Sequence, residues 1–174
     1  MTDRLVIRAP NHLGEIILAL PALHAASVRE RAEYGTAPIV QVVSGLVPLL
    51  SLAGLDARVL ALADRRDIRA AAGELRERGA RRGILLTPSI SSALIFRAAG
   101  LETRRGTTGG GRAWLLTDPV DRAELLTDHR VKEFMAIAGL PVAEGEPPAP
   151  RLTELTASSS AWADRRKALR IPDD

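Results

Sequence analysis

Short apolar runs alternate with stretches of helical spacing along most of the chain. Runs of this kind are typical of parallel strands buried on both faces of a sheet. The predicted strands are Leu5–Ile7, Ile39–Val43, Arg58–Ala61 and Gly83–Leu86, with two further candidates at Arg104–Thr107 and Trp114–Thr117. The predicted helices are Glu15–Arg31, Val47–Ala53, Ile68–Arg78, Ser91–Ala99 and His129–Ala138. This alternation predicts an α/β fold with a parallel sheet of about five to seven strands, the first and fourth of them central, and helices on both faces.

Two segments interrupt the regular pattern. Pro21 lies near the middle of the first predicted helix and should bend it or mark a break, because proline lacks the N–H of a helical hydrogen bond. Residues 144–150 read EGEPPAP, the composition of a linker, and a last helix is predicted at Ser158–Leu169. We therefore expect one domain over residues 1–143, followed by a linker and helix over residues 144–174.

The junction after the first strand is the strongest candidate for a ligand site. Leu5–Ile7 leads into a tight loop at Ala9–Gly14, and Glu15 stands where the loop becomes a helix. Parallel α/β folds bind ligands at such junctions, and helix N-terminal amides favour anions such as phosphate. A carboxylate there can take a proton from a hydroxyl. Equally, Glu15 can serve only to cap the helix and offset its dipole.

Composition narrows the classes of partner. Net charge is only +3, aromatic residues make up 3% of the chain, and no basic run is interleaved with aromatic residues, so we expect no nucleic-acid partner. The absence of cysteine excludes disulfides, thiolate zinc sites and a cysteine nucleophile. The three histidines, His12, His24 and His129, are too scattered in the sequence to predict a metal site.

The ends of the chain and its apolar runs bear on its location. The N-terminus leads directly into a predicted strand and lacks the pattern of a signal peptide. No apolar run approaches the ~20 residues that cross a bilayer as a helix. We therefore expect a cytoplasmic protein.

Three blocks, in this order, resemble one family. The first is APNHLGE at Ala9–Glu15, followed by LPAL; the second is TPSISSAL at Thr87–Leu94, followed by AGL and Arg105-Gly106. The third is RAWLLT at Arg112–Thr117, followed by His129-Arg-Val and the helix to Gly139. Together they resemble the N-terminal half of family 9 glycosyltransferases, the ADP-heptose:lipopolysaccharide heptosyltransferases, and are nearest to the heptosyltransferase II type. The resemblance spans most of residues 4–140.

The resemblance implies a GT-B architecture, in which two Rossmann-like domains face each other across a cleft. The N-terminal domain of such an enzyme holds a lipid-linked acceptor, and the C-terminal domain holds an ADP-sugar donor. Heptose passes to the lipopolysaccharide inner core at the cytoplasmic face of the inner membrane, and the transfer needs no metal or other cofactor. This chain would be the acceptor-binding half, in peripheral contact with that membrane and inactive without the donor-binding domain.

The same resemblance implies roles for the first block. Glu15 stands where the family has an aspartate that acts as catalytic base, so the carboxylate is kept but lies one methylene further out. Gly14 would let the backbone approach the sugar diphosphate, and Asn11 and His12 would face the cleft as polar loop tips. The alternatives are a helix cap, a turn glycine and solvent-exposed loop residues.

Further acceptor contacts are implied in the second and third blocks. These candidates are Ser89, Ser91, Ser92, Arg105, Arg112 and His129. Hydroxyls at a helix start can bond a sugar or phosphate, although N-capping is the alternative. The two arginines can form paired hydrogen bonds with phosphates and carboxylates, and the alternative is that they are ordinary surface arginines. His129 matches a family histidine at the start of a helix. We expect Asn11, Glu15, Ser89 and Ser92 to share one rim, although Pro88 and Ser91 replace an asparagine and a lysine of the family pattern.

Two other functions are compatible with the sequence. A stand-alone Rossmann-like module could bind a nucleotide or an anionic glycan without catalysis, although no G-x-G-x-x-G fingerprint follows the first strand. A degenerate remnant that only pairs with a partner chain is the third interpretation.

Overall fold

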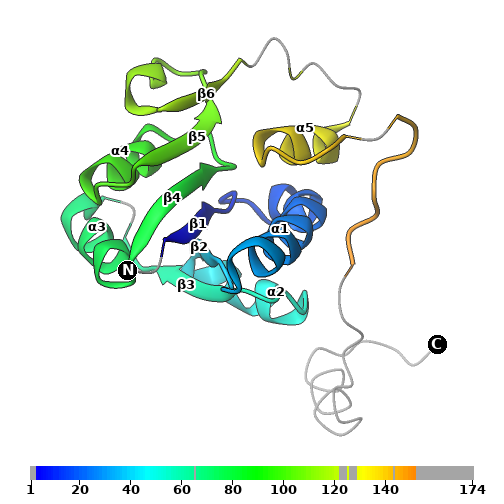
Figure 1. The fold of residues 1–174 in the computed structure, drawn as a ribbon, viewed down its shortest axis with the longest axis horizontal. Helices are drawn as coiled ribbons and strands as arrows, with labels where there is room; N and C mark the ends of the chain where they lie inside the picture. Colours follow the sequence, from blue (N-terminus) through cyan, green and yellow to red (C-terminus); the bar gives the residue numbers. More distant parts are fainter. Residues whose placement is uncertain (1–2, 65, 122–124, 126–128, 143, 152–174) are drawn as a thin grey trace, which may run out of the picture.

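One parallel sheet organises the chain (Figure 1). The computed structural model of the protein describes residues 3–64, 66–121, 125, 129–142 and 144–151. Across these residues the sheet has six strands in the order β3-β2-β1-β4-β5-β6, and all neighbouring strands are parallel. The strands are β1 (Arg4–Arg8), β2 (Ile39–Val43), β3 (Arg58–Leu62), β4 (Ala80–Leu85), β5 (Thr103–Thr107) and β6 (Asp118–Val120). This order confirms the predicted α/β sheet and the central position of the first and fourth strands.

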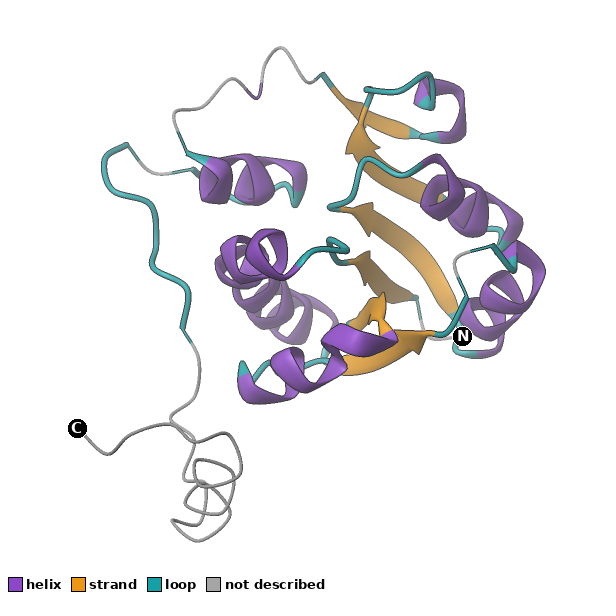
Figure 2. Cartoon of the chain, turned by 180° about the vertical axis from the view of Figure 1, so that it is seen from behind, coloured by secondary structure: helices purple, strands orange, loops and turns teal. Residues whose placement is uncertain are grey.

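Helices cover both faces of this sheet (Figure 2). They are α1 (Leu13–Tyr34), α2 (Val47–Leu52), α3 (Ile68–Glu77), α4 (Ile90–Ala98) and α5 (Arg130–Ile137), with short 3₁₀ turns η1 (Ser44–Leu46) and η2 (Ala113–Leu115). Helices α1, α2 and α5 pack on one face, and α3 and α4 pack on the other. Leu5 and Ile7 join the first of these cores while Val6 joins the second, which explains why β1 is apolar at successive positions.

Helix α1 runs continuously through Pro21, so of the two predicted outcomes the break is wrong, and the bend stays a prediction. Proline removes one backbone hydrogen bond from a helix interior. Here the cost is offset by packing, because Leu20, Ala22 and Leu23 beside it are all buried in the core. The helix ends at Gly35, whose φ of 67° is left-handed and whose N–H donates to the Arg31 carbonyl.

The sixth strand differs from its predicted position. Trp114–Thr117 was expected to be a strand, but its first part forms η2, and the strand β6 begins at Asp118. Leu115 is buried while Trp114 is 64% exposed. A short apolar run in the sequence is compatible both with a strand and with a turn that is buried on one side. Here Leu115 is buried as part of the 3₁₀ turn η2.

The C-terminal part of the expected domain division stays a prediction. Residues 144–151 contain no helix or strand in the described residues, in keeping with a linker composition. The helix predicted at Ser158–Leu169 lies outside the described residues.

Substitution of Gly83 in β4 should destabilise the fold. A Cβ at this position would lie 2.5 Å from Phe96 Cδ2 and 2.6 Å from Leu101 Cδ2, so the core must shift to admit it. We expect Gly83→Ala to lower the free energy of unfolding by about 1–3 kcal/mol in chemical denaturation. The control is Gly73→Ala in α3, where the nearest atom is 4.0 Å away and the free energy should rise by about 0.5–1 kcal/mol. Equal effects of the two substitutions would contradict this account.

Candidate functional site at the carboxyl edge of the sheet

The carboxyl ends of β1 and β4 form a topological switch point. From β1 the chain turns to α1 on one face, and from β4 it turns to α4 on the opposite face. The two loops therefore leave neighbouring strands in opposite directions, and their bases are tied where the Leu86 N–H donates to the Arg8 carbonyl at 3.0 Å. Ligands bind at this point in open parallel sheets.

Glu15 is the third residue of α1, and its side chain is 37% exposed. Its Oε2 accepts hydrogen bonds from Nε and Nη2 of Arg130, at 3.1 Å and 2.9 Å. Within the described part of the chain no hydrogen bond reaches Oε1. One carboxylate oxygen is thus held by the protein, and the other is available to a ligand.

Arg130 opens α5 and was not among the residues selected from the sequence. Its Nη1 donates to Glu133, and its guanidinium lies 4.8 Å from the centre of the Phe134 ring. Burial lowers the pKa of Arg130, but hydrogen bonds to Glu15 and Glu133 outweigh burial and raise the pKa overall. Arginine in the first turn opposes the helix dipole, which is the signal that could have drawn attention to it.

Asn11 is held by a buried arginine. Arg8 is 0% exposed, and it donates to the carbonyls of Ala9 and Gln41 at 3.1 Å and to Asn11 Oδ1 at 2.5 Å. The loop after β1 is therefore fixed from beneath, and Asn11 is half-buried rather than free in solvent.

The other two candidates in this loop are open to solvent. His12 is exposed, and as the residue before α1 it makes no capping hydrogen bond with its side chain. Gly14 is also exposed, and a Cβ added there would meet nothing within 4 Å. Nothing in the described chain requires glycine at this position, so there is room for a ligand against the backbone.

Arg112 supports the loop after β4 rather than presenting its charge to solvent. It is 0% exposed and donates to the carbonyls of Thr107 at 2.9 Å, Thr87 at 2.7 Å and Ser89 at 3.3 Å, and to the Thr107 hydroxyl at 2.9 Å. Burial lowers the pKa of Arg112. In this structure its donors are directed to protein oxygens.

The three serines differ in position. Ser89 is the N-cap of α4, because its Oγ accepts from the Ser92 N–H at 3.3 Å. Its hydroxyl also shares a 2.8 Å hydrogen bond with Ser91 Oγ, and both side chains are partly exposed. Ser92 is buried, with 2% of its surface exposed. Among the described residues no hydrogen bond joins Glu15 to these serines, so their expected common site stays a prediction.

Arg105 and His129 hold α5 in place. Arg105 donates to the carbonyls of Ile137 at 2.8 Å and Ala136 at 3.2 Å, and pairs with Asp118 at 2.7 Å. His129 caps the other end of the helix, with Nδ1 accepting from the Val131 N–H at 3.2 Å. Both side chains therefore have structural partners.

A polar hollow of about 580 Å³ extends the rim toward β3. It is lined by Asp64, Arg66, Ile68 and Ser91, so it joins the turn before α3 to the start of α4. Asp64 and Arg66 were not selected from the sequence, although their place directly after a parallel strand is the signal that could have found them.

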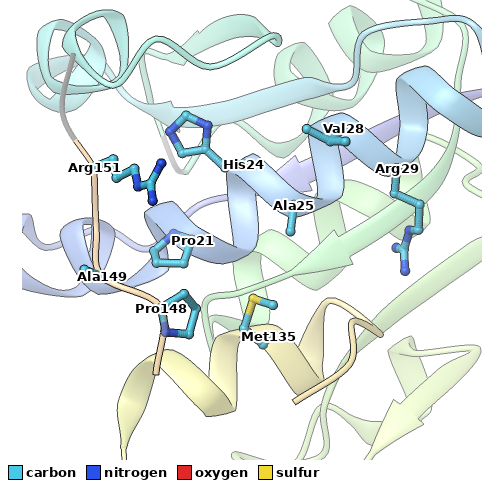
Figure 3. Close-up of a pocket in the computed structure, with 9 residues that line it drawn as sticks. All are labelled: Pro21, His24, Ala25, Val28, Arg29, Met135, Pro148, Ala149 and Arg151. Atoms are coloured by element: carbon cyan, nitrogen blue, oxygen red, sulfur yellow. The ribbon is translucent and has the colours of Figure 1, made fainter. Parts of the chain in front are cut away.

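A second, largely apolar groove of about 620 Å³ lies elsewhere (Figure 3). Its walls come from the outer face of α1, from Met135 of α5 and from the segment around Pro148.

Among the described residues no group of histidine, aspartate and glutamate side chains could hold a metal ion. Of the helices that the structure describes, none is long and apolar enough to cross a membrane.

The same fold occurs in solved structures of bacterial glycosyltransferases. The chain aligns with "E. coli ADP-heptose lps heptosyltransferase II" at 22% identity and a TM-score of 0.72, covering 93% of this chain and 50% of that one. It aligns with the glycosyl transferase family 9 protein of Veillonella parvula DSM 2008 at 15% identity and a TM-score of 0.70, covering 98% and 50%. It aligns with E. coli heptosyltransferase WaaC with ADP at 20% identity and a TM-score of 0.61, covering 83% and 50%.

These alignments establish the fold. The chain spans about half the length of the structures it matches. No protein-family model matches the sequence, and no curated protein matches it. The structural neighbours are two heptosyltransferases and a family 9 glycosyl transferase, and the chain has the α/β, Rossmann-like fold of about half of each of them.

Removal of the buried Arg112 side chain should destabilise the site. Arg112→Met keeps an apolar stem but leaves the carbonyls of Thr87 and Thr107 without their buried donors, at about 1–3 kcal/mol for each unsatisfied group. We expect the free energy of unfolding to fall by about 2–4 kcal/mol in chemical denaturation. Arg76→Met, on the exposed side of α3, is the matched control and should change it by less than about 0.5 kcal/mol. If Arg112→Met and Arg76→Met have the same free energy of unfolding, Arg112 does not stabilise the site through these hydrogen bonds.

Proposed function

We propose that this chain is the acceptor-binding half of a family 9 glycosyltransferase. The enzyme transfers heptose or a related sugar from an ADP-sugar to the inner core of lipopolysaccharide. Residues 1–143 form the acceptor domain, and residues 144–174 lead to a donor-binding domain outside this chain. The transfer takes place at the cytoplasmic face of the inner membrane, where the protein makes peripheral contact with the lipid-linked acceptor.

One observation carries this proposal: a half-exposed carboxylate at the switch point of a heptosyltransferase-like fold. Glu15 has an oxygen, Oε1, without a hydrogen bond from the described residues. An acceptor hydroxyl can reach that oxygen from the open side of the rim. A base within hydrogen-bond reach of a hydroxyl is the requirement for its activation.

The chemistry of the step follows from that arrangement. Glu15 Oε1 takes the proton of the acceptor hydroxyl while the hydroxyl oxygen forms a bond to the anomeric carbon of the sugar. The bond between that carbon and the diphosphate oxygen breaks, and ADP leaves with the electron pair. One solved neighbour was crystallised with ADP-2-deoxy-2-fluoro heptose, which supports an ADP-sugar as the donor class.

The remaining candidates divide into two groups. Asn11, His12, Gly14, Ser89 and Ser91 are accessible enough to contact the acceptor or the sugar diphosphate. The others, Ser92, Arg105, Arg112 and His129, contribute by holding the loops and α5 that carry the first group.

A non-catalytic module is the competing function. The contact between Glu15 and Arg130 ties α1 to α5, which favours a structural role for the carboxylate. Such a module would bind a nucleotide or an anionic glycan at the same rim and transfer nothing.

Glu15→Gln in the full-length protein separates these functions. Glutamine is nearly isosteric but cannot accept the proton, so kcat should fall by about 10²–10⁴-fold while the KM for acceptor stays within about twofold. The measurement is a transfer assay with ADP-heptose and a lipopolysaccharide core acceptor. The isolated 174-residue chain should give no transfer, because the donor-binding domain is missing.

The matched control is Glu33→Gln, the same change at an exposed position near the other end of α1. It should leave kcat unchanged. A Glu15→Gln enzyme within about fivefold of wild type would exclude Glu15 as the base. A full-length protein that binds the acceptor but transfers no sugar would favour the module.

A further inference from the structure

Arg130 is placed to control the direction in which the Glu15 carboxylate faces. Both Nε and Nη2 of Arg130 donate to the same oxygen, Oε2, at 3.1 Å and 2.9 Å. We propose that Arg130 is a positioning residue for Glu15, holding Oε2 so that Oε1 meets the acceptor hydroxyl. This role rests on the proposed function, and it concerns orientation of the base rather than contact with substrate.

Arg130 is itself well fixed. Its Nη1 is engaged by Glu133 one turn further along α5, and its guanidinium lies 4.8 Å from the centre of the Phe134 ring, which is fully buried. The pKa of Arg130 is lowered by burial and raised more strongly by its two carboxylate partners, so the side chain keeps its charge. A fixed, charged donor pair can define the rotamer of a half-exposed carboxylate.

Attachment of α5 to the domain does not depend on this pair alone. At the other end of the helix, Arg29 of α1 donates from Nη1 to the Gly139 carbonyl at 2.8 Å and from Nη2 to the Ala138 carbonyl at 3.0 Å. Arg29 thus links the same two helices as Arg130 does, but far from the carboxylate. This makes it a matched control for loss of helix packing.

The length of the side chain at position 15 fits this arrangement. Glu15 reaches Arg130 with hydrogen bonds of about 3 Å, near the ordinary distance. The family that the sequence resembles has aspartate at this position. Its side chain is one methylene shorter, so its carboxylate would lie further from Arg130. In this chain the longer side chain of Glu15 is what brings its carboxylate within reach of Arg130. Glu15→Asp should therefore lose the hydrogen bonds that Arg130 donates.

The test is a steady-state transfer assay of the full-length protein with ADP-heptose and a lipopolysaccharide core acceptor. Arg130→Ala should lower kcat by about 10–100-fold, the size of effect expected from a misplaced catalytic group. The acceptor KM should stay within about twofold, because uniform binding is unaffected. Arg130→Lys should restore kcat only in part, to a value between those of Arg130→Ala and wild type, because an ammonium keeps the charge but lacks the planar donor pair. Arg29→Ala should leave kcat near the wild-type value.

Epistasis gives a second readout. Because Glu15→Asp already gives up the contact, adding Arg130→Ala to it should lower kcat by less than about twofold further. A drop in kcat for Arg29→Ala as large as for Arg130→Ala would overturn the proposal, because α5 packing would then explain both. A loss confined to acceptor KM would also overturn it, since Arg130 would then bind the acceptor.

Crystal structures of the wild-type protein and of Arg130→Ala keep this inference separate from the proposed function. The Glu15 carboxylate should change orientation in the variant while the α1 backbone stays in place. If the carboxylate keeps its orientation, Arg130 does not position it, whatever the transfer assay shows. If the carboxylate moves but the wild-type protein transfers no sugar, the positioning contact stands and the proposed function fails.

Discussion

The carboxyl edge of the sheet depends on buried arginines that satisfy backbone carbonyls. Loops that leave a sheet buried on both faces carry C=O groups out of the strand ladder, and each needs a donor. Arg8 donates to Ala9 in the loop after β1 and to Gln41 of β2. Arg112 donates to Thr87 in the loop after β4 and to Thr107 at the end of β5. Guanidinium suits this task because it presents five donors in a plane and is more weakly hydrated than ammonium. Both arginines are buried, and they support these loops through hydrogen bonds.

Helix α5 is held by the same chemistry. Arg29 and Arg105 both donate to carbonyls in its last turn and just beyond, where cations also complement the helix dipole. Arg130 at the opposite end bonds Glu133 in the first turn of α5 and also reaches across to Glu15 of α1. These three arginines therefore serve internal hydrogen bonding and ion pairing.

The sequence predicts the fold better than the roles of single side chains. Two-sided burial makes Leu5–Ile7 of β1 and the second half of β4 continuous apolar runs, so the central position of both strands could be inferred from residues such as Val6 and Ile84. The run at Trp114 misled the prediction, because local pattern does not reveal which of its residues the tertiary fold buries. At the site, Arg112 was assigned to substrate because sequence carries no information about burial, and Arg130 was overlooked because its partner is distant in the chain.

Under the proposed function, the pairing of Glu15 with Arg130 lets a glutamate hold its carboxylate in a defined place, although its side chain is one methylene longer than that of aspartate. A longer side chain has one more rotatable bond, so its carboxylate samples more positions, and a near-attack arrangement becomes less populated. The hydrogen bonds from Arg130 to Oε2 restrict the torsion that orients the carboxylate, so the additional positions of the longer side chain are no longer sampled. The donor must come from an element that is itself rigid, and α5 meets this condition because Arg105 of β5 donates to two carbonyls in its last turn. In such a design, glutamate at this position depends on the presence of the arginine, whereas a shorter aspartate would be positioned by the α1 backbone alone.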